Sequence, residues 1–393
     1  MINKHYKEIK TLIRKKKYVD YYFPGLYGFS PYVGCEHGCV YCDGRCEKYY
    51  VEGIFDKDIT IRKNMIDLLK EEMPKKREKG AILIGSGVSD PYQPVEAEEG
   101  LMREALEVIE SYGFPVIILT KSHLLLRDID VLKRINQKAK STVMVSLTFT
   151  NDEERKRIEP FASSVEERLR ILKECKKAGL STGLLAMPLL PYITETKENI
   201  TNLLKEAKEV DVDFVMASGL TLRAGIQKEG YFKLIEEYYP ELLDSYKYIY
   251  SDNKASGAPK WNYPDNQYSV LNEQMEKYCF SPFLPFEVVR QQLPLYRSIM
   301  ILLSVMNTLY KRKGISTERL KNSSKKYSNW INEKITYYNR RRNLKYEDLE
   351  EEVFDMMESG RINEIIENAK LSHFLFKIVC EDKTLDYFDL KLK

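Results

Sequence analysis

Four of the chain's seven cysteines lie within one short segment, GCEHGCVYCDGRC, which runs from Gly34 to Cys46. Three of them, Cys35, Cys39 and Cys42, have the spacing C-x3-C-x2-C. Thiolates at such short intervals are typical of a metal centre or of redox chemistry. Cys46 follows four residues after Cys42, and the spacing leaves its role open.

The cellular compartment decides what such a cluster means. Seven cysteines in 393 residues is a sparse and odd number, and the amino-terminal segment MINKHYKEIKTLIRKKKYVD has no apolar run that would form a secretory signal. The longest apolar stretch, at 298–306, is shorter than the roughly 20 residues of a membrane-spanning helix. We therefore expect a cytoplasmic protein without membrane insertion. In that reducing compartment, clustered cysteines indicate a metal or redox site rather than disulfides.

Two kinds of metal centre use cysteine clusters of this size. Structural zinc sites usually take four ligands from two C-x2-C halves, often with histidines, and only one such half is present. In that interpretation Cys46 or His37 supplies the fourth ligand, and the chain is a zinc-binding interaction protein without enzymatic activity. Three thiolates can instead bind three irons of a [4Fe-4S] cluster and leave the fourth iron open to another ligand.

The segments around the cysteines alternate between strand-like and helix-like patterns. Short apolar runs rich in β-branched residues are followed by amphipathic stretches of helical length. The expected strands are 81–86, 115–120, 141–149, 181–190 and 213–220, with one more just before Cys35, and the expected helices are 64–79, 96–112, 125–138, 165–178 and 197–210. This order predicts an α/β fold, a partial (β/α)6 TIM-type barrel, whose active site lies at the carboxyl ends of the strands.

The pattern changes after about residue 231, where tyrosine-rich helical sequence leads into a Gly-, Pro- and Asn-containing stretch at 252–267 and then into further helices. We expect a basic amino-terminal segment at 1–24, a core barrel at 25–250 and a helical carboxy-terminal region at 251–393. The net charge of +3 gives no general sign of nucleic-acid binding. Two stretches, 321–330 and 335–346, interleave basic and aromatic residues, which makes nucleic acid a candidate partner.

The cysteine spacing, with Tyr41 before the third cysteine, resembles the signature of the radical S-adenosylmethionine (radical SAM) superfamily. Four further segments resemble, in order and spacing, its spore photoproduct lyase branch: SDPYQPVE at 89–96, LTKS at 119–122, VSLTF at 145–149 and EPFASSVEERL at 159–169. The resemblance covers residues 25–220. It implies a [4Fe-4S] cluster on Cys35, Cys39 and Cys42, S-adenosylmethionine as second cofactor, and an electron donor such as flavodoxin or ferredoxin.

The resemblance also implies a chemistry and a set of cofactor contacts. In this superfamily S-adenosylmethionine binds the open iron through its amino and carboxylate groups, and an electron from the cluster cleaves it to a 5′-deoxyadenosyl radical. Ser89, Lys121 and Ser146 match family positions that contact the cofactor, and Tyr41 matches an aromatic residue near the adenine. A lysine ammonium suits a carboxylate, and serine hydroxyls suit amino, carboxylate and ribose groups. Asp90 is a further candidate for cofactor binding.

Several of these residues also have ordinary structural interpretations. Ser146 is a small strand residue, and Lys121 follows a strand where turns favour polar residues anyway. Glu96 is placed to cap a helix. Arg168 follows a capping-box pattern at 163–167 and is expected to be a solvated helix arginine.

Two positions depart from the lyase pattern. The lyase has a hydrogen-donating cysteine where this chain has Gly87, and a tyrosine where it has Asp43. Because both belong to the proposed radical-quenching relay of the lyase, we do not expect thymine-photoproduct repair by that route. Cys46 and Cys279 are candidate replacement hydrogen donors, and an inert thiol is the alternative interpretation for Cys46.

The sequence therefore predicts a radical SAM enzyme, lyase-like or modifying, that abstracts hydrogen from an unidentified substrate. A nucleic-acid substrate predicts that the basic carboxy-terminal helices lie beside the barrel mouth. A peptide or small-molecule substrate predicts that tyrosine-rich apolar surface closes the mouth. The zinc-binding alternative predicts one tetrahedral zinc and no cofactor cleavage.

Overall fold

The computed structural model of the chain describes residues 2–85, 88–260, 263 and 267–393. Its main sheet contains β2 (Arg14–Lys15), β3 (Tyr27–Phe29), β6 (Ile82–Ile84), β7 (Val116–Thr120), β8 (Ser141–Ser146), β9 (Ser181–Leu189) and β10 (Phe214–Gly219). The strand order is β10-β9-β8-β7-β6-β3-β2. All neighbours from β3 to β10 pair in parallel, and the short β2 pairs antiparallel to β3 at one edge.

The order of the parallel strands in the sheet follows their order in the chain, as in a (β/α) barrel. Their apolar side chains, such as Ile118 on β7 and Val143 on β8, pair across the sheet and are buried, because parallel sheets are covered on both faces. Among the described residues no strand pairing closes β10 against the other edge. The predicted partial (β/α)6 barrel is thereby confirmed.

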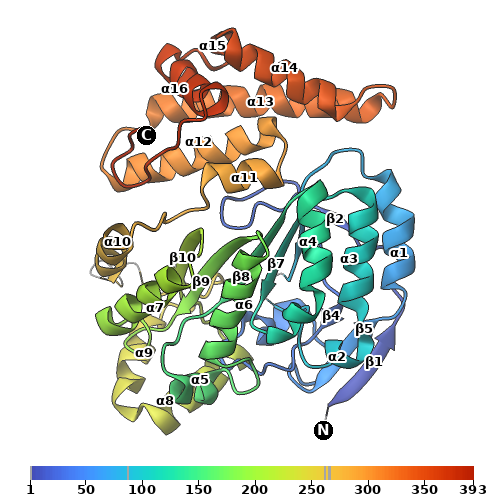
Figure 1. Cartoon of the computed structure of the whole chain (residues 1–393). Coiled ribbons are helices and arrows are strands. Elements are labelled where there is room, and N and C mark those ends of the chain that lie inside the picture. The colour runs from blue at the N-terminus through green and yellow to red at the C-terminus, as the bar shows by residue number, and fades with distance from the viewer. Residues whose placement is uncertain (1, 86–87, 261–262, 264–266) are drawn as a thin grey trace.

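Helices connect the successive strands, and several lie alongside the sheet in Figure 1. They are α1 (Met65–Glu72), α2 (Glu96–Glu99), α3 (Leu101–Tyr112), α4 (Ile129–Lys138), α5 (Asp152–Ile158), α6 (Val165–Lys177) and α7 (Lys197–Glu209), with the 3-10 helices η3 (Met73–Lys75) and η4 (His123–Asp128). Helix α6 begins with the predicted capping box: Ser164 accepts from the Glu167 N–H, and the Glu167 carboxylate accepts from the Ser164 N–H.

A small second sheet, which the sequence pattern did not predict, holds the start of the cysteine segment. It consists of β1 (Asn3–Lys7), β5 (Asp58–Arg62) and β4 (Tyr32–Val33), in that order. We expected one strand before Cys35, and the structure has two there: β3 belongs to the barrel and β4 belongs to this small sheet. Gly34 follows β4 with φ +84°, and a Cβ there would lie 2.7 Å from the carbonyl oxygen of Asp58, so the turn requires glycine.

Helices that follow β10 lie at both ends of the sheet (Figure 1). At the carboxyl ends are α8 (Ile226–Tyr238), η5 (Pro240–Leu242) and α9 (Leu243–Ile249). Gln227 of α8 donates a hydrogen bond to the backbone carbonyl of Tyr41 at 2.8 Å, which joins this helix to the cysteine segment. Helix α10 (Gln267–Lys277) contacts α7.

At the amino ends of the strands are α11 (Phe286–Gln292), α12 (Leu295–Arg312), α13 (Glu318–Arg340), α14 (Tyr346–Glu358), α15 (Ile362–Ile366) and α16 (Ala369–Cys380). Gln292 accepts from the Ala81 N–H just before β6 at 2.7 Å, and its side chain donates to Thr142 at the start of β8 at 2.6 Å. A buried pair of Glu78 and Arg297 reinforces this junction. In the described parts of the chain, we find no helix with the length and apolar character needed to cross a membrane.

Candidate active site

A cavity of about 300 Å³ lies at the carboxyl ends of the parallel strands. The cysteine segment and the residues at or after the ends of β6, β7, β8, β9 and β10 line it. Among the lining residues are all eight predicted cluster ligands and cofactor-binding residues: Cys35, Cys39, Tyr41, Cys42, Ser89, Asp90, Lys121 and Ser146. The fold therefore brings together residues from three loops and from the end of β8, at the end of the barrel where such folds have their active sites.

The loop after β6 is tied to the cysteine segment. Gly85 turns the chain at φ +88°, and a Cβ there would lie 2.4 Å from the carbonyl oxygen of Leu119 on β7, so a side chain would collide with backbone. Ser89 further along donates its hydroxyl proton to the carbonyl of Gly34 at 2.8 Å. Gly87, where the lyase has its donor cysteine, lies outside the described residues.

Asp90 connects the same loop to β7. Its carboxylate accepts hydrogen bonds from the Thr120 hydroxyl at 2.8 Å, the Lys121 N–H at 2.7 Å and the Tyr92 N–H at 2.9 Å. Burial raises the pKa of Asp90, but His37 and the backbone donors outweigh burial and hold that pKa below its ordinary value. Since protein donors already engage the carboxylate, this geometry favours a role in positioning Lys121.

His37, a possible zinc ligand in the sequence analysis, has a protein neighbour at each ring nitrogen. Nε2 lies 3.2 Å from the Asp90 carboxylate, and Nδ1 lies 3.2 Å from the carbonyl oxygen of Phe161. Within the described ranges, no three His, Cys, Asp or Glu side chains are gathered so that they could hold one metal ion.

The three spaced cysteines are free thiols, with Cys35 and Cys39 buried and Cys42 partly exposed. Burial raises the pKa of the Cys39 thiol to about 12 and also raises the pKa of the other two. Iron binding therefore has to release protons, because thiolates are the ligands. The Gly44 N–H already donates to the Cys42 sulfur at 3.4 Å. This donor set fits a cluster held by three cysteines.

A buried charged network that the sequence analysis missed lies beside Cys39. The hydroxyl of Tyr41 and the guanidinium of Arg168 both donate to the carboxylate of Glu159, and the two charged side chains are 0% exposed. Arg168 also donates to the carbonyl of Ser146 at 3.0 Å. Because Arg168 is fully buried, the expectation that it is solvated is wrong. Its acidic partner lies outside the helix and therefore does not appear in the helical charge pattern. Glu159 and Arg168 both belong to the segment EPFASSVEERL. The resemblance of that segment to the lyase branch was the signal that could have pointed to them.

Lys121 presents its ammonium group to this network. Its Nζ lies 5.8 Å from the centre of the Tyr41 ring. Burial lowers the pKa of Lys121, but Cys39 in its thiolate form and the Glu159 carboxylate outweigh burial and raise that pKa above its ordinary value. A protonated lysine therefore lines the cavity together with the cysteines. Ser146, on the other side, donates its hydroxyl proton to the carbonyl of Met187 at 3.0 Å.

The two candidate hydrogen donors do not line the cavity. Cys46 is buried between the 3-10 helices η1 (Asp43–Arg45) and η2 (Glu47–Tyr49), and Cys279 is exposed after α10. Asp43, in contrast, lines the cavity, where it pairs with Arg223 and accepts a hydrogen bond from Thr221 at 3.2 Å.

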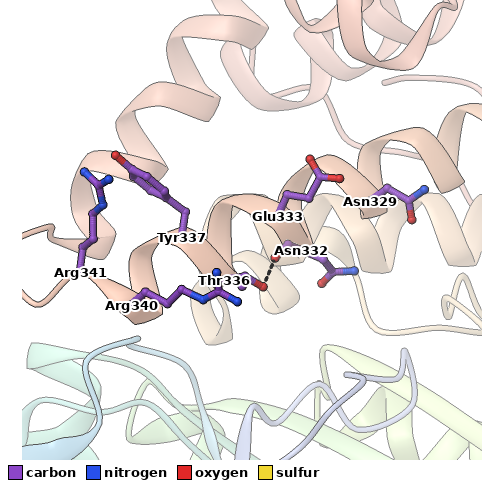
Figure 2. Close-up of a pocket in the computed structure, with 7 residues that line it drawn as sticks. All are labelled: Asn329, Asn332, Glu333, Thr336, Tyr337, Arg340 and Arg341. Atoms are coloured by element: carbon purple, nitrogen blue, oxygen red, sulfur yellow. Dashed lines mark hydrogen bonds between the residues drawn. The ribbon is translucent and has the colours of Figure 1, made fainter.

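A wider depression, of about 580 Å³, lies on the surface of α13 (Figure 2). One face of this helix and the residue after it line the depression: Asn329, Asn332, Glu333, Thr336, Tyr337, Arg340 and Arg341. It includes part of the basic and aromatic stretch 335–346. The depression shares no lining residue with the cysteine cavity and belongs to the helices at the opposite end of the barrel.

A family model of the radical SAM superfamily matches residues 29–206, which include the three spaced cysteines and every predicted cofactor contact. The chain belongs to the radical SAM superfamily. It is accordingly an enzyme whose cofactors are a [4Fe-4S] cluster and S-adenosylmethionine, and radical SAM enzymes generally need a reductant such as flavodoxin or ferredoxin. Membership rules out the interpretation as a non-enzymatic zinc-binding protein.

Several known proteins are similar to this chain over part of its length. An uncharacterized protein of Methanocaldococcus jannaschii is 33% identical over 239 residues, which cover 60% of this chain and 85% of the relative. The radical SAM Nalpha-GlyT isomerase of Pseudomonas phage M6 is 25% identical over 239 residues, 59% of this chain and 47% of the isomerase. A solved structure of spore photoproduct lyase with bound AdoMet is similar with a TM-score of 0.49 and 17% identity, over 65% of this chain and 74% of the lyase.

Proposed function

We propose that this radical SAM enzyme abstracts a hydrogen atom from a peptide or small-molecule substrate that reaches the cysteine cavity. The observation that carries the proposal is the gathering of three spaced cysteines, a lysine and two serines around one cavity. When bound, the cluster and S-adenosylmethionine supply reductive cleavage of the sulfonium carbon–sulfur bond, which yields the 5′-deoxyadenosyl radical.

The chain's own residues divide the task of holding these groups. Cys35, Cys39 and Cys42 would bind the cluster as thiolates. Lys121 would bind the carboxylate of S-adenosylmethionine, because a compact ammonium group suits that charge. Ser89 and Ser146 already donate their hydroxyl protons to backbone carbonyls, so toward the cofactor their oxygens act as acceptors, which suits its amino and hydroxyl groups.

The surroundings of the cavity bear on the substrate class. Buried residues of α8 and α9, among them Tyr231 and Tyr246, form one cluster with Cys39 and Tyr41 of the cysteine segment. Neither Tyr231 nor Tyr246 lines the cavity, so this packing supports the cysteine segment rather than contacting the substrate. The basic helices that argued for nucleic acid lie instead at the amino ends of the strands. By the criterion set from the sequence, the position of the basic helices argues against nucleic acid, and we therefore propose a peptide or small molecule as the substrate class.

We also propose that the enzyme does not use the lyase's quenching relay. A donor must lie within about 3–3.5 Å of the radical that it quenches, and it needs a weak bond to hydrogen. Asp43, at the position of the lyase's tyrosine, carries a carboxylate that pairs with Arg223. Reconstituted protein should therefore not restore thymines from the dinucleotide lesion, as chromatography of the products would show. Multiple-turnover repair would contradict this part of the proposal.

Deuterium transfer tests the substrate class. Cells grown in heavy water yield a deuterated extract, which is separated into a low-molecular-mass fraction, a peptide fraction and a nucleic-acid fraction. Each fraction is incubated with reconstituted enzyme, dithionite and unlabelled S-adenosylmethionine, and the deuterium content of 5′-deoxyadenosine is measured by mass spectrometry. We expect deuterium from the first or second fraction, and the Cys39→Ala variant serves as control. Transfer from the nucleic-acid fraction alone would contradict the proposed substrate class.

A further inference from the structure

The segment from the last residue of α5 toward the start of α6, residues 158–163, contacts two parts of the site that are far apart in the sequence. The carbonyl of Ile158 accepts a hydrogen bond from the Val40 N–H of the cysteine segment at 3.0 Å. The N–H of Ser163 donates to the carbonyl of Lys121 at 3.3 Å. The segment thus joins the cluster loop to the loop that carries the cavity lysine.

The charged pair of Glu159 and Arg168 extends this link through side chains. The carboxylate of Glu159 accepts from the hydroxyl of Tyr41 and from Arg168. The guanidinium also donates to the carbonyls of Ser163 at 2.9 Å and Ser146 at 3.0 Å. One buried pair therefore fixes an aromatic residue of the cluster loop relative to the end of β8.

The pair is charged and dry, although burial makes that arrangement unfavourable. Burial raises the pKa of Glu159, but Arg168 and Lys121 outweigh burial and keep that pKa below its ordinary value. Taking two ions out of water costs free energy that their attraction often fails to return, and apolar residues of similar volume often pack as well. Neither side chain lines the cavity. The charged groups of Glu159 and Arg168 make hydrogen bonds to Tyr41 and to Ser146, and apolar residues in their place would not make them.

We propose that Glu159 and Arg168 are positioning residues for the cofactor site, which hold Tyr41 at a fixed position relative to Lys121 and Ser146 before S-adenosylmethionine binds. This inference rests on the proposed function, in which that cavity binds the cofactor. The centre of the Tyr41 ring lies 5.8 Å from the Lys121 ammonium. A displaced ring would therefore disturb both the contact predicted for Tyr41 with the adenine and the contact predicted for Lys121 with the carboxylate. Preorganised contacts of this kind lower the cost of binding.

The test is a double-mutant cycle in the reconstituted holoenzyme. The variants are Tyr41→Phe, which removes one oxygen atom, Glu159→Gln and the double variant. The dissociation constant of S-adenosylmethionine is measured from the change that the cofactor causes in the electron paramagnetic resonance spectrum of the reduced cluster. Each single variant should keep its iron content and weaken binding about tenfold, as expected for a lost hydrogen bond to a charged group. The double variant should bind no more weakly than the weaker-binding single variant, because Tyr41→Phe removes the donor of one contact and Glu159→Gln replaces the charged acceptor of that same contact by a neutral one.

The matched control is Glu78→Gln, which breaks a buried pair with Arg297 at the opposite end of the barrel. It should leave the dissociation constant unchanged, so that general loss of stability is distinguished from loss of positioning. Additive effects in the cycle, or single variants that bind like the wild type, would overturn the inference. If the wild-type cluster spectrum does not respond to S-adenosylmethionine, the proposed function fails instead.

Discussion

Replacement of Lys121 by methionine isolates the contribution of one charge to cofactor binding. The backbone at this position is held without help from the side chain: its N–H donates to Asp90 at 2.7 Å, and its carbonyl accepts from Ser163 at 3.3 Å. Methionine has a similar length and also packs well against aromatic rings, so the contact with Tyr41 is largely kept. The change therefore removes the ammonium and little else.

The expected magnitude follows from the type of contact. A hydrogen bond to a charged group contributes about 1.5–3 kcal/mol. Since about 1.4 kcal/mol corresponds to a tenfold change, Lys121→Met should weaken S-adenosylmethionine binding by roughly 10- to 150-fold. The assay is calorimetric titration of anaerobically reconstituted proteins with matched iron content.

The control for this experiment is Lys79→Met. Its ammonium also lies over an aromatic ring, 4.0 Å from the centre of the Phe114 ring, but just before β6 at the other end of the strands. This variant should bind S-adenosylmethionine like the wild type. An affinity of Lys121→Met within twofold of the wild type would refute the role given to this lysine.

Three further predictions follow from the geometry. Cys46→Ala should keep the iron content and the absorption band near ~400 nm, whereas Cys42→Ala should lose both; loss in Cys46→Ala would contradict the ligand assignment. Glu78→Gln should lower the free energy of unfolding by about 3–5 kcal/mol in denaturant titrations, because it leaves the buried Arg297 without its charge partner; an unchanged midpoint would show that the junction is not held by this pair. Burial raises the pKa of Glu195 from 4.5 to about 7. The folded protein therefore keeps this proton at pH values where the unfolded chain has lost it. The free energy of unfolding should accordingly fall as the pH rises from 4.5 to about 7. Glu195→Gln should flatten that decline in the same titrations, and an unaltered pH dependence would contradict it.

Much of the barrel was predictable because buried parallel strands are short apolar runs with amphipathic helices between them. The second sheet was not, because β1 is mostly exposed and its residues NKHYK show no apolar pattern. Its pairing with β5 depends on residues more than fifty positions away, which no local pattern reveals. The division into segments at 1–24, 25–250 and 251–393 stays a prediction.

The site was predicted as a set of residues but not as a connected network. The residues named by the cysteine spacing and by the segments around Ser89, Lys121 and Ser146 line one cavity, and their roles toward the cofactors stay a prediction. The helical pattern around Arg168 indicated solvent exposure, but Arg168 pairs with the buried Glu159 outside the helix. Helix periodicity does not reveal such a partner. Asp90 is likewise engaged by the Thr120 hydroxyl at the end of β7 and by the Lys121 N–H just after it, and these contacts exist only once the strands have paired.

The most direct test of the central claim is the cleavage of S-adenosylmethionine without substrate. The protein is purified and reconstituted without oxygen, reduced with dithionite and mixed with S-adenosylmethionine, and 5′-deoxyadenosine is quantified by chromatography with mass spectrometry. The account predicts about four irons per chain and formation of 5′-deoxyadenosine by the wild type, with none from the Cys39→Ala variant. Cluster-loaded wild-type protein that binds S-adenosylmethionine yet forms no 5′-deoxyadenosine would contradict it.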